Sequence, residues 1–166
     1  SNGKSKIVFD PFFHSNFNIY QLVPNDIIKS MFENKAPYDS IDAIFISHAH
    51  GDHFAADRVL KYLKQFPKTK LIAPSQAIEQ IKLLDGHESI LPQTHSIKMT
   101  YGDAVQNFKT GNLQVGVVRI PHSGWPSSRT DVSNLLFRVT LDETTTVMHM
   151  RDADHHDIHV KPHHAH

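Results

Sequence analysis

Three histidines and an aspartate occupy six positions of one short segment, His48-x-His50-x-Asp52-His53. Imidazole nitrogens and carboxylate oxygens are ligands of transition metals such as Zn²⁺. In an extended backbone, residues two apart point to the same side, so His48 and His50 can converge on one ion. Gly51 permits a sharp change of chain direction, which can turn Asp52 and His53 towards the same pocket. The types and spacing of these residues therefore predict a metal site.

The segments around this cluster have the patterns of regular elements that would position it. Residues 41–47, "IDAIFIS", form a nearly continuous apolar run, which is typical of a strand covered on both faces. Residues 54–66 have apolar side chains at helical spacing, and a strand over 69–74 and a helix over 75–86 follow. Because α/β proteins usually bind ligands at the carboxyl ends of their strands, we expect a rigid strand end to aim the cluster.

The second half of the chain has a different pattern. Residues 96–122, 134–142 and 144–150 are predicted to form antiparallel strands joined by turns. Strands alternating with helices and then hairpins suggest a mixed sheet with helices packed outside it. The length fits one α/β (α+β) domain over residues 1–166, in which residues 155–166 are a histidine-rich tail or a cut element.

Composition limits the classes of protein and of site. Lys plus Arg and Asp plus Glu both number 17, which is not the basic excess of a nucleic-acid binder, so we expect no nucleic-acid partner. No stretch approaches the roughly 18 consecutive apolar residues of a membrane span, so we expect no membrane partner and a soluble protein. The sequence does not reveal the compartment, for which the cytoplasm and the periplasm are the alternatives. Cysteine is absent, which excludes disulfides and thiolate ligands, and carboxylates and some of the 14 histidines must hold any transition metal.

The histidine-rich motif resembles the HxHxDH signature of the metallo-β-lactamase superfamily, a fold of hydrolases with one or two metals. In "IPHSG", His122 follows a strand and resembles the third histidine of that family. In "VMHMRDAD", Asp152 resembles the aspartate that bridges two metals, with Arg151 where the family usually has Gly. "KIVFDPFF" resembles an early strand of the family, with Asp10 either supporting the metal site or acting as a simple turn residue. The resemblance covers residues 6–154 in the expected order.

The resemblance implies a metallo-β-lactamase-like four-layer αββα sandwich. The family has a last metal-binding histidine several tens of residues after the bridging aspartate, whereas this chain stops soon after Asp152. Either His163, His164 or His166 takes that role, or the ligand lies outside this chain. We therefore expect a segment cut at one or both ends.

The resemblance also implies a metal-dependent hydrolase that uses metal-bound hydroxide. Three histidines and a water form an open catalytic arrangement for zinc, which lowers the pKa of its water to about 7. Asp52, which lies between two histidines, is predicted to be catalytic as a proton shuttle. The expected cofactor is Zn²⁺ as one or two ions, with Mn²⁺ or Fe as alternatives. The implied ligands are His48, His50 and His122 at a first site and Asp52 and His53 at a second, with Asp152 bridging them.

The expected substrate is a small ester, lactone, amide or phosphodiester, and the full HxHxDH motif resembles the lactonase-like branch of the superfamily. Trp125 either forms a wall of the substrate pocket or packs at its rim, and Arg129 can contact an anionic substrate. One alternative is a non-catalytic or truncated metal-binding domain with a structural or regulatory role. In another, the tail alone binds metal and residues 48–53 are solvated loop residues. His149 is predicted to be a packed histidine.

Overall fold

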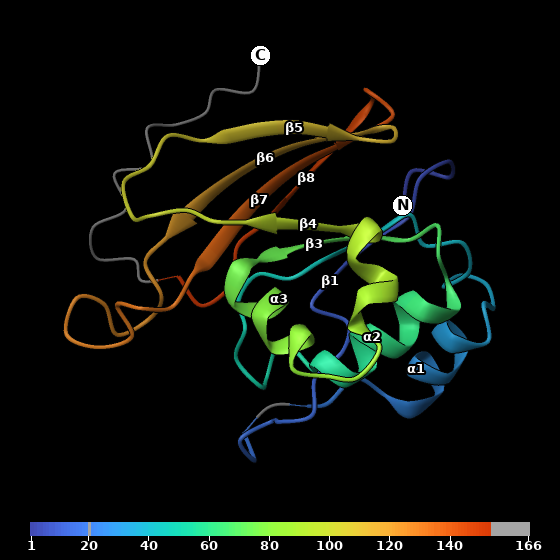
Figure 1. Cartoon of the computed structure of the whole chain (residues 1–166). Helices are drawn as coiled ribbons and strands as arrows, with labels where there is room; N and C mark the ends of the chain where they lie inside the picture. The colour runs from blue at the N-terminus through green and yellow to red at the C-terminus, as the bar shows by residue number, and fades with distance from the viewer. Residues whose placement is uncertain (20, 154–166) are drawn as a thin grey trace.

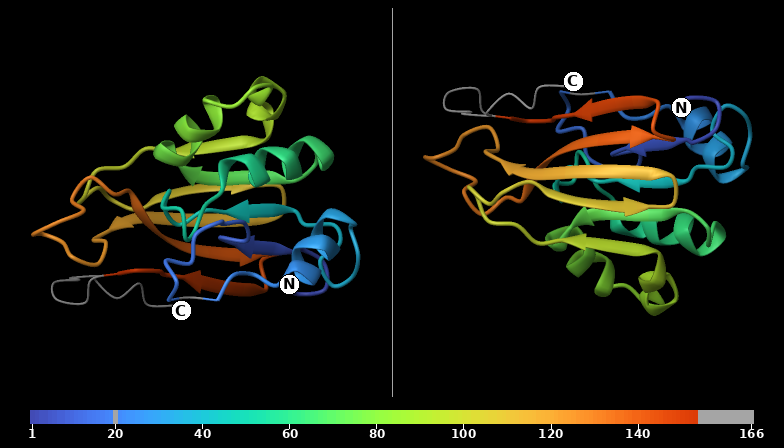
Figure 2. Two further views of the ribbon diagram at one scale, coloured as in Figure 1. Left: turned by 90° about the horizontal axis from the view of Figure 1, so that it is seen from below. Right: turned by 90° about the horizontal axis from the view of Figure 1, so that it is seen from above.

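The computed structural model describes residues 1–19 and 21–153, in which two four-stranded sheets lie face to face. Helices cover the outer face of one sheet, as Figures 1 and 2 show. The first half of the chain contains β1 (Ile7–Phe9), α1 (Asn25–Phe32), β2 (Ala43–Phe45), α2 (Ala56–Gln65), β3 (Lys70–Pro74), α3 (Ser75–Lys82), the 3₁₀ helix η1 (His87–Gln93) and β4 (Thr94–Ile97). The second half contains β5 (Gln106–Thr110), β6 (Leu113–Ile120), β7 (Asn134–Leu141) and β8 (Thr145–His149).

The first sheet is parallel, with the strand order β1-β2-β3-β4. Its strand β2 is buried on both faces, which explains the continuous apolar run around it. Ile44 packs into the core beneath the helices, together with Tyr62 and Leu63 of α2. Its neighbour Phe45 points the other way, into the core between the two sheets. The apolar run therefore contributes side chains to both hydrophobic cores.

The second sheet is an antiparallel meander with the strand order β5-β6-β7-β8. Along β6, buried and partly exposed residues alternate over most of the strand, so that one face is turned to the first sheet. Val115 and Val117 belong to this inner face, as does Phe137 of β7. The ring of Phe137 packs edge-on against that of Phe45, with 5.2 Å between the centroids. Aromatic and β-branched side chains thus join the two sheets.

Three of the expectations drawn from the sequence pattern are wrong. The strands form two separate sheets, not one mixed sheet, and residues 94–97, predicted in part as an antiparallel strand, pair in parallel with β3. The helix predicted over 75–86 ends at Lys82, and η1 follows it.

The described residues hold three of the four expected layers, namely helices, parallel sheet and antiparallel sheet. Residues 155–166 lie outside the described part, so one domain over the whole chain stays a prediction.

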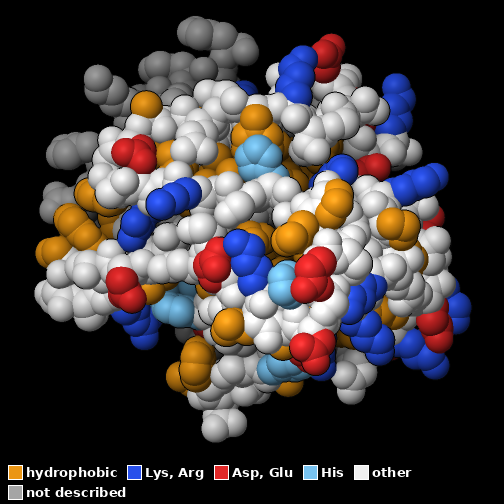
Figure 3. Space-filling model, in the orientation of Figure 1, with side chains coloured by type: hydrophobic (Ala, Val, Ile, Leu, Met, Phe, Trp, Pro, Cys, Tyr) orange, Lys and Arg blue, Asp and Glu red, His pale blue; other side chains and the backbone are white. Residues whose placement is uncertain are grey.

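Helices that could cross a membrane are absent from the described residues. On the face shown in Figure 3, Lys and Arg side chains are interspersed with Asp and Glu side chains. This distribution matches the equal numbers of acidic and basic residues in the chain.

The strand directions bring several strand ends to one edge of the sandwich. The carboxyl ends of β1 and β2 lie side by side because these strands are parallel neighbours. In the second sheet, the carboxyl ends of β6 and β8 flank the amino end of β7 because the three strands are antiparallel. The candidate metal ligands follow β2, β6 and β8, so this edge is where they meet.

Candidate metal centre

A tight turn after β2 arranges the histidine-rich motif. The backbone N–H groups of His53 and Phe54 both donate to the carbonyl of His50, at 3.0 and 2.8 Å, which folds the segment back on itself. His48 and His53 thereby come close, with 4.1 Å between their ring centroids. The turn does not need the conformational freedom of glycine at Gly51, contrary to our expectation. Its φ is not positive, and an added Cβ would meet the side chain of Ser15 at an ordinary 3.5 Å.

His122 comes to the same place from the second sheet, two residues after the end of β6. Its ring centroid lies 4.9 Å from those of both His48 and His50. The ligand atoms of His48, His50 and His122 lie within 4.8 Å of one another. A second group with the same spacing consists of His48, Asp52 and His53. The structure therefore brings together residues that lie far apart in the sequence.

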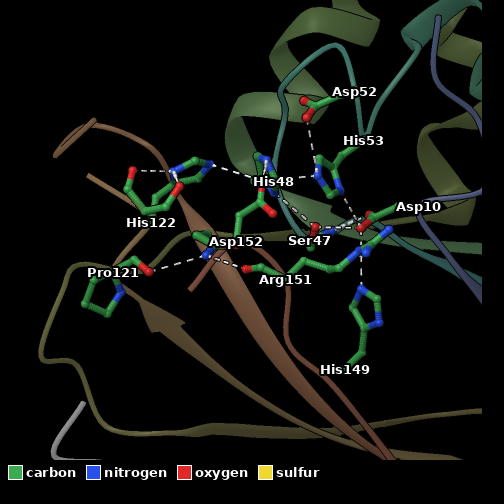
Figure 4. Close-up of polar contacts among 12 residues, drawn as sticks. Asp10, Ser47, His48, Asp52, His53, Pro121, His122, His149, Arg151 and Asp152 are labelled. Carbon is green, nitrogen blue, oxygen red and sulfur yellow. Dashed lines mark hydrogen bonds and ion pairs between the residues drawn. The ribbon is translucent and has the colours of Figure 1, made fainter. Parts of the chain in front are cut away.

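Asp152 lies between the two groups, as Figure 4 shows. Its Oδ2 is 3.3 Å from Nε2 of His53 and 3.8 Å from Nε2 of both His48 and His122. Its backbone carbonyl accepts a hydrogen bond of 2.7 Å from the N–H of Ser123, so the segments after β6 and β8 are joined directly. This position suits a bridging carboxylate, a role that stays a prediction.

Three of the imidazoles have their Nδ1 atoms engaged, which leaves Nε2 to face the centre. Nδ1 of His122 lies 3.0 Å from the carbonyl oxygen of Ser123, which can only accept. Nδ1 of His53 lies 3.1 Å from a carboxylate oxygen of Asp10. Nδ1 of His48 lies 3.1 Å from Oγ of Ser47. Nδ1 of His48 and Nδ1 of His122 therefore carry the proton, and Nε2 of each of these two rings keeps a free lone pair of the kind that a metal needs.

Asp10, which follows β1, is the common partner of this network. Its carboxylate accepts hydrogen bonds from the N–H and the hydroxyl of Ser47, at 2.7 and 2.6 Å. It also lies 3.1 Å from Nδ1 of His53 and 3.4 Å from Nε2 of His149. Burial opposes ionisation of Asp10, but these partners outweigh it and hold its pKa well below the usual range. Because the Ser47 hydroxyl donates to Asp10, it accepts from His48.

Sequence patterns did not reveal the contribution of Ser47, which continues the apolar strand. His149 is packed as expected, with its ring stacked on that of Phe9 at 4.2 Å. The sequence did not reveal that its Nε2 faces Asp10. For Asp10, the sequence predicted either a simple turn residue before proline or a residue that supports the metal site. No sequence signal predicts either contact, since each partner lies on another strand.

The ionisation of His48 and His50 favours metal binding, whereas that of His53 opposes it. Burial lowers the pKa of His48 to about 2, assisted by the positive charge of His53, so His48 is neutral at physiological pH. Burial and His122 also lower the pKa of His50. Burial lowers the pKa of His53 as well, but the hydrogen bond and the charge of Asp10 outweigh it and raise that pKa.

Several buried polar atoms of the cluster have no hydrogen-bond partner among the described residues. They are Nε2 of His48, Nε2 of His122 and Oδ1 of Asp52. Buried polar atoms are rarely left alone because losing water without a replacement costs free energy. These atoms are of the donor types that Zn²⁺ takes, so the residues fit a metal ion.

The loop between β6 and β7 contributes the remaining candidates. Trp125 is half-buried and its ring contacts that of Tyr101, with 5.0 Å between the centroids, an arrangement that fits both of the roles predicted for it. Arg129 is exposed. The charge of Arg129 is close enough to contribute to the low pKa of His50. The tail candidates His163, His164 and His166 lie outside the described residues.

One of the comparisons with known proteins covers nearly the whole chain. The family model described as "Beta-lactamase superfamily domain" matches residues 1–165. Among solved structures, the chain is similar to the metallo-beta-lactamase fold protein YhfI from Bacillus subtilis, with 21% identity and a TM-score of 0.46. That match covers 70% of this chain and 43% of the other, so the chain spans less than half the length of that protein. The comparison with curated proteins found no match.

Proposed function

The chain belongs to the family of beta-lactamase superfamily domains, and from this premise we propose that it is a metal-dependent hydrolase. The observation that carries the proposal is the pair of buried Nε2 atoms of His48 and His122. Neither has a hydrogen-bond partner among the described residues, and each lies 3.8 Å from Oδ2 of Asp152. Two buried imidazole nitrogens without a partner cost free energy that a bound metal ion would offset.

The first ion would be held by His48, His50 and His122. Three imidazoles with a fourth position open to solvent are the arrangement of catalytic zinc sites. When bound, such an ion supplies Lewis acidity, which lowers the pKa of water to about 7 and polarises a substrate oxygen. Zn²⁺ suits this mixed nitrogen and oxygen donor set, and Mn²⁺ and Fe are the alternatives. The hydrogen bonds on Nδ1 keep the rings oriented for this role.

A second ion would be held by Asp52 and His53, with Asp152 bridging the two positions. Oδ2 of Asp52 lies 3.7 Å from Nε2 of His53, and Oδ2 of Asp152 lies 3.3 Å from the same nitrogen. Asp52 is also the proposed proton carrier, because its Oδ1 is buried and has no partner among the described residues. A carboxylate beside the reacting centre can accept a proton from water and give it to a leaving group.

The proposed substrate is a small ester, lactone, amide or phosphodiester, with a lactonase-like activity as the first expectation. Arg129 supports a substrate with negative charge, because its guanidinium is exposed in the loop that follows His122 and its charge acts on His50. No nucleic acid and no membrane are among the proposed partners.

The proposal is tested by replacing a ligand whose side chain contributes little to the core. His50→Ala suits this purpose because His50 is half-buried, and His95→Ala is the matched control because His95 is exposed on β4. Both variants are assayed for bound zinc and for turnover of a panel of lactones, esters, thioesters and phosphodiesters. We expect turnover to fall at least about 100-fold in His50→Ala, which corresponds to about 2.7 kcal/mol of the barrier, and to be retained in His95→Ala.

Three outcomes distinguish the readings. Metal binding without turnover across the panel would contradict hydrolysis and favour the non-catalytic metal-binding domain. Metal binding that disappears on deletion of residues 155–166 but persists in His50→Ala would place the metal on the tail instead. An equal loss of turnover in His50→Ala and His95→Ala would show that the activity does not depend on this cluster.

A further inference from the structure

Asn134 lies at the edge of the second sheet where the metal cluster is built. It is the first residue of β7 and pairs with Ile120, the last residue of β6. Its exposed fraction is 0%, so it is a fully buried polar side chain beside the candidate metal centre. Burial of an amide is costly unless its polar atoms are paired. The partners of Asn134 therefore indicate why an amide stands here.

The amide nitrogen of Asn134 donates to two backbone carbonyls. Nδ2 lies 2.9 Å from the carbonyl oxygen of Arg151 and 3.5 Å from that of Pro121. Both carbonyls are drawn in Figure 4, each at the end of a dashed line. Arg151 immediately precedes Asp152, and Pro121 immediately precedes His122. One side chain thus ties the two segments that bring ligands from the second sheet.

The next residue extends this pattern to the first sheet. The backbone N–H of Leu135 donates to the carbonyl of Ser47 at 2.9 Å, and Ser47 immediately precedes His48. The start of β7 is therefore bonded to the residue before each of the three ligand-bearing segments. On the far side of the ligands, the N–H of Ser123 donates to the carbonyl of Asp152. The ligands His122 and Asp152 are held between these two sets of bonds.

Only an amide supplies the N–H groups for two carbonyls at this position. A primary amide has two N–H donors, whereas a hydroxyl has one O–H donor and a leucine side chain, which has the same number of heavy atoms, has none. Oδ1 of Asn134 has no partner among the described residues, so the side chain is not held by its acceptor. Among the described residues, the hydrogen bonds of this side chain are made by Nδ2.

We infer that Asn134 is a positioning residue, which sets the separation of the His122 and Asp152 segments so that both can reach the same metal position. This inference rests on the proposed metal-dependent function. Asn134 does not contact the reacting atoms and acts through the backbone of two ligand segments. Partners of this indirect kind typically contribute about 10–100-fold to metal affinity.

The test compares Asn134→Leu with Gln93→Met in the full chain. Gln93 is the matched control, because it is also a buried amide that donates to one backbone carbonyl, that of Leu63 at 3.1 Å. Its Oε1 likewise has no partner among the described residues, and it lies in η1, away from the cluster. Both substitutions remove the N–H donors. Unfolding of the metal-free proteins and titration with Co²⁺, followed by its visible absorption, are measured for each.

We expect Asn134→Leu to bind Co²⁺ about 10–100-fold more weakly and with an altered absorption band, and Gln93→Met to bind it like the unsubstituted protein. If Asn134→Leu does not fold, Asn134→Ser, which keeps one donor, replaces it. We expect a smaller loss of Co²⁺ affinity and a smaller change of the absorption band in that variant. Unchanged affinity and absorption at position 134, or an equal loss in the control, would overturn the inference. Absence of Co²⁺ binding in the unsubstituted protein would instead overturn the proposed function, and the inference with it.

Discussion

At the scale of single residues, the candidate centre depends on which nitrogen of each imidazole carries the proton. Asp10 controls this directly for His53 and, through the hydroxyl of Ser47, for His48. One carboxylate therefore orients a proposed ligand of each ion. Its own ionisation is secured by the same hydrogen bonds, since they hold its pKa well below the usual range.

Asp10→Asn tests this coupling. The backbone of Asp10 has a positive φ of 44°, which asparagine tolerates, so the substitution changes the side chain only. It replaces one acceptor oxygen by a donor and removes the charge. We expect zinc affinity to fall about 10–100-fold, as measured by competition with a chelator. Asp39→Asn, which removes a partly exposed carboxylate that pairs with Lys6, is the control, and similar affinities in both variants would contradict the role of Asp10.

At the scale of elements, α2 holds the helix layer against the parallel sheet through a cluster of aromatic rings. Tyr62 is fully buried there, with its ring centroid 5.3 Å from that of Phe12 and 4.5 Å from that of Phe66. Its hydroxyl has no hydrogen-bond partner among the described residues. Burial raises the pKa of Tyr62 to about 12, because the charged form would be desolvated.

Tyr62→Phe is expected to stabilise the protein by about 1 kcal/mol at neutral pH, since it removes a buried hydroxyl without a partner. The raised pKa adds a second expectation. Because the pKa of Tyr62 is higher in the folded protein than in the unfolded chain, its ionisation at high pH favours the unfolded chain. The free energy of unfolding is therefore unaffected by this ionisation below pH 10 and decreases as the pH rises towards about 12. Denaturant unfolding from pH 7 to 12 should show a smaller alkaline loss in Tyr62→Phe. The exposed Tyr101→Phe serves as control, and a Tyr62→Phe variant of lower stability would contradict the expectation.

At the scale of the whole molecule, the candidate ligands join the two sheets. Residues 48–53 follow a strand of the parallel sheet, whereas His122 and Asp152 follow strands of the antiparallel sheet. A metal ion bound by both sets would connect the two halves of the fold. It would bind the folded chain and not the separated segments, so binding and folding would be coupled.

Zinc is therefore expected to stabilise the chain against unfolding. At a free zinc concentration 100 times the dissociation constant, linkage predicts about 2.7 kcal/mol, less any binding to the unfolded histidines. Denaturant unfolding with zinc and with excess chelator measures the gain. We expect the gain to be largely lost in His122→Ala and kept in His95→Ala. A gain that His122→Ala leaves intact would show that the second sheet does not contribute to the site.

The sequence by itself determined the elements whose pattern is local and the motif whose ligands are adjacent. The apolar run around β2, the periodicity of α2 and the HxHxDH spacing each depend on neighbouring residues, so they could be predicted, and so could the family. Tertiary structure decided that the strands divide into two sheets and that residues 94–97 join the first. It also decided that Ser47, Asn134 and His149 make their hydrogen bonds beside the candidate centre. Strand pairing and hydrogen-bond partners depend on contacts between distant segments, and such contacts leave no periodic trace in the sequence.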